Sequence, residues 1–234
     1  KKVLETATIP ATGSSDTPSY GVYVGMTYTA GNLIYQITSI DTATLGQSKV
    51  IGVVAAKKNK ITKITIPDRA DCKGYGLNVT EVGDNAFKAM KKLKKVTFGA
   101  NVKIIGKAAF SNCKKLNKIN FKNVTTIGNN AFAGCKALKK LTIGSKVTTI
   151  GKNAFKKCTK LKTVVMGKSV KTINAKAFTK DNKIKKITFK GKKLKTVKKN
   201  ALSSKVKKNI KTKKTKLKGN KKAIKVFKKK LKIK

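Results

Sequence analysis

The chain has 234 residues, of which 39% are apolar, and it contains neither His nor Trp. Its 58 basic and 8 acidic residues give a formal net charge of +50, and every basic residue except Arg69 is a lysine. Without His the commonest general base is missing, and from Asn85 onward Asp181 is the single acid, so paired carboxylates are excluded there. We therefore expect no enzyme and no cofactor. No run approaches about 20 apolar residues, which argues against a membrane span.

The first predicted unit is residues 1–56, which carry three lysines and three acids, so the whole charge excess follows residue 56. Runs such as LIYQIT and KVIGVVA alternate or stay apolar between Gly-containing turns, which is typical of short β-strands. We interpret 1–56 as a small β-rich segment that covers the N-terminal end of a repeat array. No signal peptide is visible ahead of it, as in a mature or trimmed segment.

Five copies of one phrase follow: VGDNAF, IGKAAF, IGNNAF, IGKNAF and INAKAF. A fixed period in the twenties predicts a solenoid, in which each repeat forms one coil and buries its apolar side against its neighbours. We place the array at residues 57–204, with about five repeats of 22–24 residues, because ITKITIP has the strand spacing before the first copy. Each phrase ends in a phenylalanine, and these phenylalanines recur at intervals of 23, 22, 23 and 23 residues. They are Phe87, Phe110, Phe132, Phe155 and Phe178.

Each repeat contains the pattern L-x-x-V-x-F, as in Leu93, Val96 and Phe98, which predicts a short strand with alternate side chains in the core. Four residues before the phenylalanine stands Gly in four copies, as at Gly106, and Asn174 in the fifth, which indicates a turn with positive φ. In stretches such as NAFAGCKAL the apolar residues recur at helical spacing. The predicted fold is therefore an α/β solenoid with a parallel sheet on the concave face and short helices on the convex face.

The last predicted unit, residues 205–234, is rich in lysine. Ile224, Phe227 and Leu231 fall on one helical face with lysines around it, which predicts a helix that covers the C-terminal end of the array. A cationic amphipathic helix on a membrane surface is an alternative, as is a strand or a frayed tail.

The combined phrase IGxxAFxxCxxLxxVxI resembles the BspA-type leucine-rich-repeat family of bacterial surface proteins. IGNNAFAGCKALKKLTI and IGKNAFKKCTKLKTVVM match it, and the resemblance covers roughly residues 61–200. The resemblance implies a right-handed leucine-rich-repeat coil in an extracellular, cell-surface or cell-wall protein. It also implies a role in adhesion and no catalytic motif, so no active-site residue follows from it.

Cys113, Cys135 and Cys158 occupy one phase of the repeat, where Met90 and Asp181 stand in the flanking copies. Because Met is an apolar substitute, we interpret this column as core. A disulfide between adjacent coils is the alternative. A zinc site is disfavoured, since the chain has no His and no CxxC pair.

On the repeat strands, the residues between the core positions point to the concave face. Like charges opposite each other on neighbouring strands destabilise a sheet, so a column of lysines there favours a polyanionic partner. A generally cationic, solvated surface is the alternative, because lysine also dominates the turns. The candidate ligand-binding residues are Lys63, Lys95, Lys118, Lys140 and Lys186.

These observations favour a non-enzymatic, cell-surface or secreted bacterial protein that serves as a binding or adhesion module. Its expected partners are anionic polymers such as teichoic acids and sulfated polysaccharides, or host extracellular proteins. A structural spacer held on an anionic cell wall is one alternative. Non-specific nucleic-acid binding is another, whereas base-specific binding is disfavoured by the single Arg and the buried phenylalanines. The oligomeric state stays open.

Overall fold

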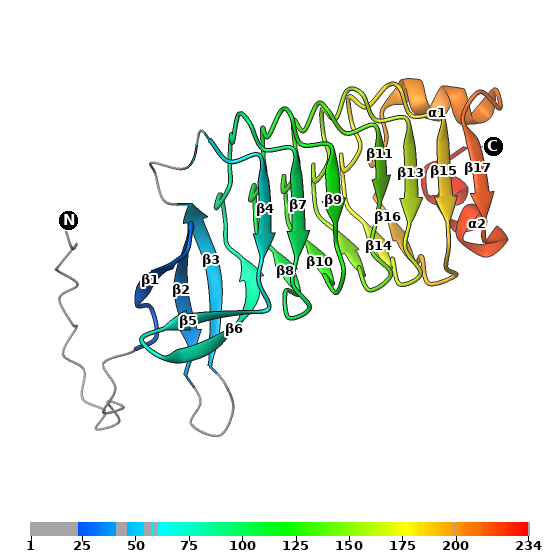
Figure 1. Cartoon of the computed structure of the whole chain (residues 1–234). Helices are drawn as coiled ribbons and strands as arrows, with labels where there is room; N and C mark the ends of the chain where they lie inside the picture. The colour runs from blue at the N-terminus through cyan, green and yellow to red at the C-terminus, as the bar shows by residue number, and fades with distance from the viewer. Residues whose placement is uncertain (1–22, 41–45, 54–57, 59, 199, 234) are drawn as a thin grey trace.

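The computed structural model describes residues 23–40, 46–53, 58, 60–198 and 200–233. The chain forms an elongated stack of coils, with the first strands at one end and two helices at the other (Figure 1). Five successive coils each contribute one strand to a front row and a two-residue strand to a row behind it, and Figure 1 shows the two rows. The predicted solenoid of repeating parallel strands is confirmed, but it has two rows of strands rather than one.

The front row consists of two parallel sheets, which we call the front sheets. Their strands run in register from coil to coil, as the L-x-x-V-x-F pattern predicts. The first sheet contains β4 (Lys63–Ile66), β7 (Lys95–Phe98) and β9 (Lys118–Asn120), and the second contains β11 (Lys140–Thr142), β13 (Thr163–Met166), β15 (Lys186–Phe189) and β17 (Lys216–Gly219).

The back row belongs to a ten-stranded sheet that the N-terminal strands extend. The insertion before the first phenylalanine forms an antiparallel hairpin of β5 and β6, and β6 pairs with β3 on one side and β8 on the other, both parallel. The strands of this back sheet are β1 (Thr27–Ala30), β2 (Leu33–Ser39), β3 (Gln47–Val53), β5 (Arg69–Cys72), β6 (Tyr75–Val82), β8 (Ile104–Ile105), β10 (Thr126–Ile127), β12 (Thr149–Ile150), β14 (Thr172–Ile173) and β16 (Thr196–Val197). Residues 1–22 of the predicted β-rich segment lie outside the described residues.

The short helices predicted around the phenylalanines are wrong, because residues 84–89 and their later copies form turns. The backbone N–H groups of Asn85, Phe87 and Ala89 donate to carbonyl groups of the next coil at 2.7–2.8 Å, where a helix would bond within itself. Residues two before and two after each phenylalanine are left-handed, which no right-handed helix tolerates. These residues are Asn85, Ala89, Ala108, Asn112, Asn130, Gly134, Asn153, Lys157, Lys176 and Lys180.

The repeated glycines serve close packing and not positive φ, which corrects the sequence interpretation. Gly106, Gly128 and Gly151 all have φ outside the left-handed region. A Cβ atom on Gly151 would lie 2.5 Å from the carbonyl carbon of Gly128 in the preceding coil. A side chain at this phase would therefore force adjacent coils apart.

The core is a set of columns that run along the stack. In the phenylalanine column, formed by the five repeat phenylalanines, the rings of Phe110 and Phe132 lie 5.2 Å apart at an interplanar angle of 2°. The rings of Phe132 and Phe155 lie 5.4 Å apart at 4°. All five side chains are buried, so each coil supplies one face of its neighbour's core.

The stack continues one coil beyond the last phenylalanine. The N–H of Phe178 donates to the carbonyl of Ala201 at 2.8 Å, and Leu202 bridges to Phe178 as the next member of the column. The segment that ends at Leu202 is therefore equivalent to IGKNAF, with Leu202 in the place of the phenylalanine. Leu202 is buried, so a branched aliphatic side chain closes the aromatic column.

Two helices lie at the C-terminal end: α1 (Ser204–Lys211) and α2 (Lys221–Lys230). Asn220 caps α2 by accepting from the N–H of Ala223 at 3.1 Å. Ala223 and Phe227 are buried, and the Phe227 ring lies 5.0 Å from that of Phe189. The apolar face of α2 is thus packed on the array, which leaves its lysines toward solvent.

Candidate functional site

The candidate lysines stand at equivalent places on successive front strands. Lys63 pairs with Lys95, and Lys95 pairs with Lys118. In the second sheet, Lys140 and Lys186 both pair with the intervening residue Thr163. All the lysines of this column are exposed.

The structure adds Lys216 to the column, because β17 pairs with β15 so that Lys216 lies opposite Lys186. Sequence reasoning missed it, since β17 follows α1 and lies outside the repeat period. The alternation in KLKG was the available signal. We call the complete set the lysine row, consisting of Lys63, Lys95, Lys118, Lys140, Lys186 and Lys216.

Repulsion within the lysine row opposes folding. Neighbouring strands lie about 4.8 Å apart, and two unit charges at that distance in water repel by roughly 0.9 kcal/mol before screening by salt. The second outward column, which includes Thr97 and Thr142, contributes hydroxyl groups beside the charges and no carboxylates. The arrangement presents a line of donors and positive charge to solvent.

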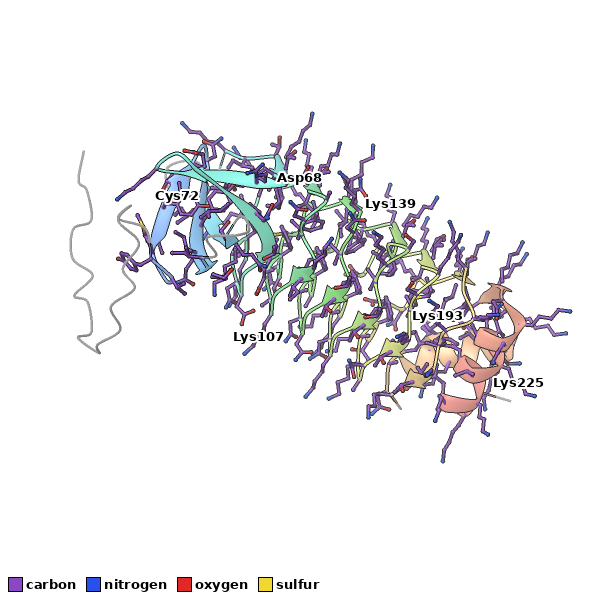
Figure 2. The ribbon with its side chains drawn as sticks, turned by 90° about the horizontal axis from the view of Figure 1, so that it is seen from below. Asp68, Cys72, Lys107, Lys139, Lys193 and Lys225 are labelled. Carbon is purple, nitrogen blue, oxygen red and sulfur yellow. The ribbon has the colours of Figure 1, made fainter. Side chains whose placement is uncertain are left out.

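Lysines also project from the rest of the molecule. Lys107 and Lys139 extend from opposite margins of the array, and Lys225 extends from the C-terminal helix (Figure 2). The positive charge therefore surrounds the array. What distinguishes the lysine row is the register that the strands impose on it.

The cysteine column lies in the core, as Met90 at the same phase of the repeat indicated. Cys113, Cys135 and Cys158 are fully buried, and each thiol donates to a phenylalanine carbonyl of a neighbouring coil at 3.0–3.4 Å. Burial raises the pKa of the Cys113 thiol to about 11 and those of the other two thiols well above their usual value. All four cysteines are free, so the disulfide alternative is not observed. Within the described part of the chain, no group of three metal-ligating side chains could hold an ion.

Asp181 continues this column as a buried acid. Its side chain is 0% exposed, and neither carboxyl oxygen has a hydrogen-bond partner. Desolvation raises the pKa of Asp181 to about 8, although the nearby backbone of Cys158 offsets part of the rise. At neutral pH the carboxyl is therefore largely protonated. It lies within the core and not at an open site.

The acids around the insertion serve turns. Asp68 accepts from the N–H of Ala100, and Asp84 accepts from the N–H of Lys107 at 2.5 Å. Asp71 accepts from the N–H of Gly74 at 3.3 Å in the turn of the β5–β6 hairpin. These carboxylates fix backbone geometry.

Comparison with known proteins identifies the repeats. The family model described as "BspA type Leucine rich repeat region" matches residues 79–215 in six copies, more than half of the chain. The chain belongs to the BspA-type leucine-rich-repeat family. The sixth copy agrees with the additional coil at Leu202. Proteins of this family are typically non-enzymatic binding modules.

Solved structures of bacterial leucine-rich-repeat proteins share the fold. The chain is similar to a leucine-rich repeat protein of Bacteroides ovatus (24% identity, TM-score 0.52, 75% of this chain covered), to the pneumococcal vaccine antigen PcpA (22%, 0.65, 78%) and to a leucine rich cell surface protein of Faecalibacterium prausnitzii (25%, 0.54, 82%). The matches span 55%, 47% and 52% of those three chains, about half of their length. A search of curated proteins finds no match. None of the described helices is long and apolar enough to cross a membrane.

Proposed function

We propose that this protein is a non-enzymatic binding module of the bacterial cell surface, and that its lysine row holds an anionic polymer such as a teichoic acid or a sulfated polysaccharide. The observation that carries the proposal is the register of exposed lysines on paired strands. The surface location is supported by membership of the family and by the similar cell surface protein of Faecalibacterium prausnitzii.

The chemistry of lysine suits such a partner. Its ammonium group is a hydrated point charge on a flexible stem, so it follows an anionic chain without requiring a fixed geometry. Such groups on neighbouring strands about 4.8 Å apart, as at Lys63, Lys95 and Lys118, raise the local concentration of a polyanion and release its counterions on contact. The polymer in turn removes the repulsion that the row imposes on the folded protein.

The test compares two triple variants that change the net charge equally. In the first, Lys95, Lys118 and Lys140 of the lysine row become Glu. In the matched control, the exposed turn lysines Lys91, Lys114 and Lys136 of the same three coils become Glu. Binding to dextran sulfate and to poly(glycerol phosphate) teichoic acid is measured over a range of salt concentrations.

The row variant is expected to lose at least about tenfold in affinity at low salt. The slope of log K against log salt should become shallower by about two to three. The control should lose much less. Equal losses of affinity in the two variants would show that the lysine row acts only as part of a general cationic surface. A host matrix protein bound tightly with little salt dependence would contradict the polyanion proposal itself.

A further inference from the structure

A groove of about 520 Å³ lies on the outward side of the back sheet, where the N-terminal strands meet the first coils. It falls between β3, β6 and β8, away from the front strands that carry the lysine row (Figure 1). Its volume is within the usual range for small-molecule sites, about 300–1,000 Å³. Its lining residues are Thr38, Gln47, Asn78, Thr80, Glu81, Asn101, Lys103 and Ile104.

The chemistry of this groove differs from that of the surrounding surface. Three amide side chains, two hydroxyls and one carboxylate line it together with a single lysine, in a protein whose net charge is +50. Several of these groups are held in place by one another. The Asn101 amide donates to Asn78 Oδ1 at 2.9 Å, and the Thr80 hydroxyl donates to Gln47 Oε1 at 3.4 Å. The groove is therefore preorganised before any ligand arrives.

Ile104 provides an apolar contact beside these polar groups. It is 42% exposed, although the residues at the same phase in the following coils are threonines. We call those residues the threonine ladder: Thr126, Thr149, Thr172 and Thr196. The repeat fold evidently accepts threonine at this phase. Ile104 is therefore not required at this phase by the fold, and it places an aliphatic side chain beside the polar groups of the groove.

Glu81 lies opposite Ile104 on the neighbouring strand and is partly buried. Burial raises the pKa of its carboxyl, the positive charge of Lys49 opposes this rise, and the negative charge of Asp84 adds to it. A partly desolvated carboxylate accepts stronger hydrogen bonds than an exposed one. Its negative charge balances that of Lys103, so the lining of this groove carries no net charge, unlike the lysine row.

We propose that this groove binds a neutral oligosaccharide. A sugar ring offers hydroxyl groups around its edge and C–H groups on its face, and the groove offers amide and carboxylate partners beside one exposed aliphatic side chain. The dominance of uncharged hydrogen-bonding groups, with one positive and one negative residue, favours a neutral ligand. This site is independent of the lysine row and adds a second class of ligand to the protein.

The experiment presents the whole protein to an array of neutral oligosaccharides in about 1 M NaCl, where the Debye length is about 3 Å and binding through the lysine row is suppressed. Glycans that are retained are then titrated against three single variants. Glu81→Gln keeps the shape but removes the charge, and Ile104→Thr restores the residue of the ladder. Thr149→Ile places the same aliphatic group two coils away as a control.

We expect Glu81→Gln to weaken binding about tenfold and Ile104→Thr to weaken it severalfold. Thr149→Ile should bind like the unaltered protein, and so should the lysine-row triple variant in the same high salt. The proposal is overturned if no neutral glycan is retained, or if the retained glycan binds the first two variants unchanged. Thermal unfolding of each variant checks that a loss of binding is not caused by a loss of fold. Polyanion binding at low salt is measured in a separate assay, because it tests the lysine row and not this groove.

Discussion

The phenylalanine column and the lysine row both run along the array with about one residue per coil, but they act on folding in opposite directions. In the column, each ring stacks on its own copies at 5.0–5.4 Å, so repetition stabilises the stack. In the row, ammonium groups face their own copies across paired strands at Lys63, Lys95 and Lys118 and again at Lys186 and Lys216, so repetition there costs free energy. Both are products of the same period.

This difference separates the residues that the fold requires from the residues that it only tolerates. A residue that attracts its copies is explained by the stability of the solenoid alone. A residue that repels its copies, yet recurs, is not explained by the stability of the solenoid. The two sets run along the same array, although Thr163 interrupts the lysine row between Lys140 and Lys186.

The largest effect should come from the column. Phe132 lies between two stacked rings, and Phe132→Ala leaves a cavity on both sides. We expect a loss of about 3–5 kcal/mol in the free energy of unfolding, which for a chain of this size lowers Tm by roughly 10 °C. Urea unfolding measures it, with Lys136→Ala in the same coil as the matched control. A loss below about 1 kcal/mol would show that the rings do not support one another.

The second prediction concerns Asp181, which interrupts a favourable column with a buried acid. Asp181→Cys restores the residue of the three preceding coils. The pKa of this carboxyl is about 8 in the folded protein and close to 3.9 in an unfolded chain, so folding is penalised as pH rises between these values. The variant should therefore gain little below about pH 4, and up to about 5 kcal/mol above about pH 8.

Urea unfolding near pH 4, 7 and 9 measures this gain. The neighbouring thiol of Cys158 stays protonated over the range because its pKa is raised well above the usual value, so Asp181 is the group of this column that titrates. A gain that is the same at all three pH values would mean that the side chain matters through its shape and not through its charge.

The smallest effect should come from the lysine row. Lys95 has lysines in register on both sides, and Lys95→Thr places there the residue found at Thr163. We expect a gain below about 1 kcal/mol at low salt that disappears near 1 M salt. Lys91→Thr, which makes the same charge change in a turn, should gain less. A loss of stability in Lys95→Thr would show that the row does not oppose folding.

The sequence predicted much of this arrangement because the period assigns each residue a phase. It placed the phenylalanines, the cysteines and five of the six row lysines correctly on their columns. It failed at the turns, where apolar spacing imitated a helix. Left-handed residues such as Asn85 and Asn112 redirect the backbone N–H groups to the next coil, and this inter-coil bonding has no signature in hydrophobic periodicity.

The repeated glycine was misassigned for a similar reason. Its requirement comes from the backbone of the preceding coil, as at Gly151 above Gly128, and not from its own φ. The groove could not be predicted at all. Gln47, Asn78 and Asn101 come together only because the hairpin insertion joins the N-terminal strands to the first coils in one sheet.

The hydrogen bonds between the turns of successive coils bear on how the number of repeats could change in evolution. Four coils, those of Phe87, Phe110, Phe132 and Phe155, each donate from the same three positions to carbonyl groups of the coil that follows, so a further coil of this kind can be inserted among them without a new kind of contact. Duplication of one repeat in the gene would lengthen the stack by one turn and, where that repeat carries a lysine, the row by one charge. Copy number of the repeat thus sets the length of the lysine row and, under the proposed function, its avidity for a polyanion.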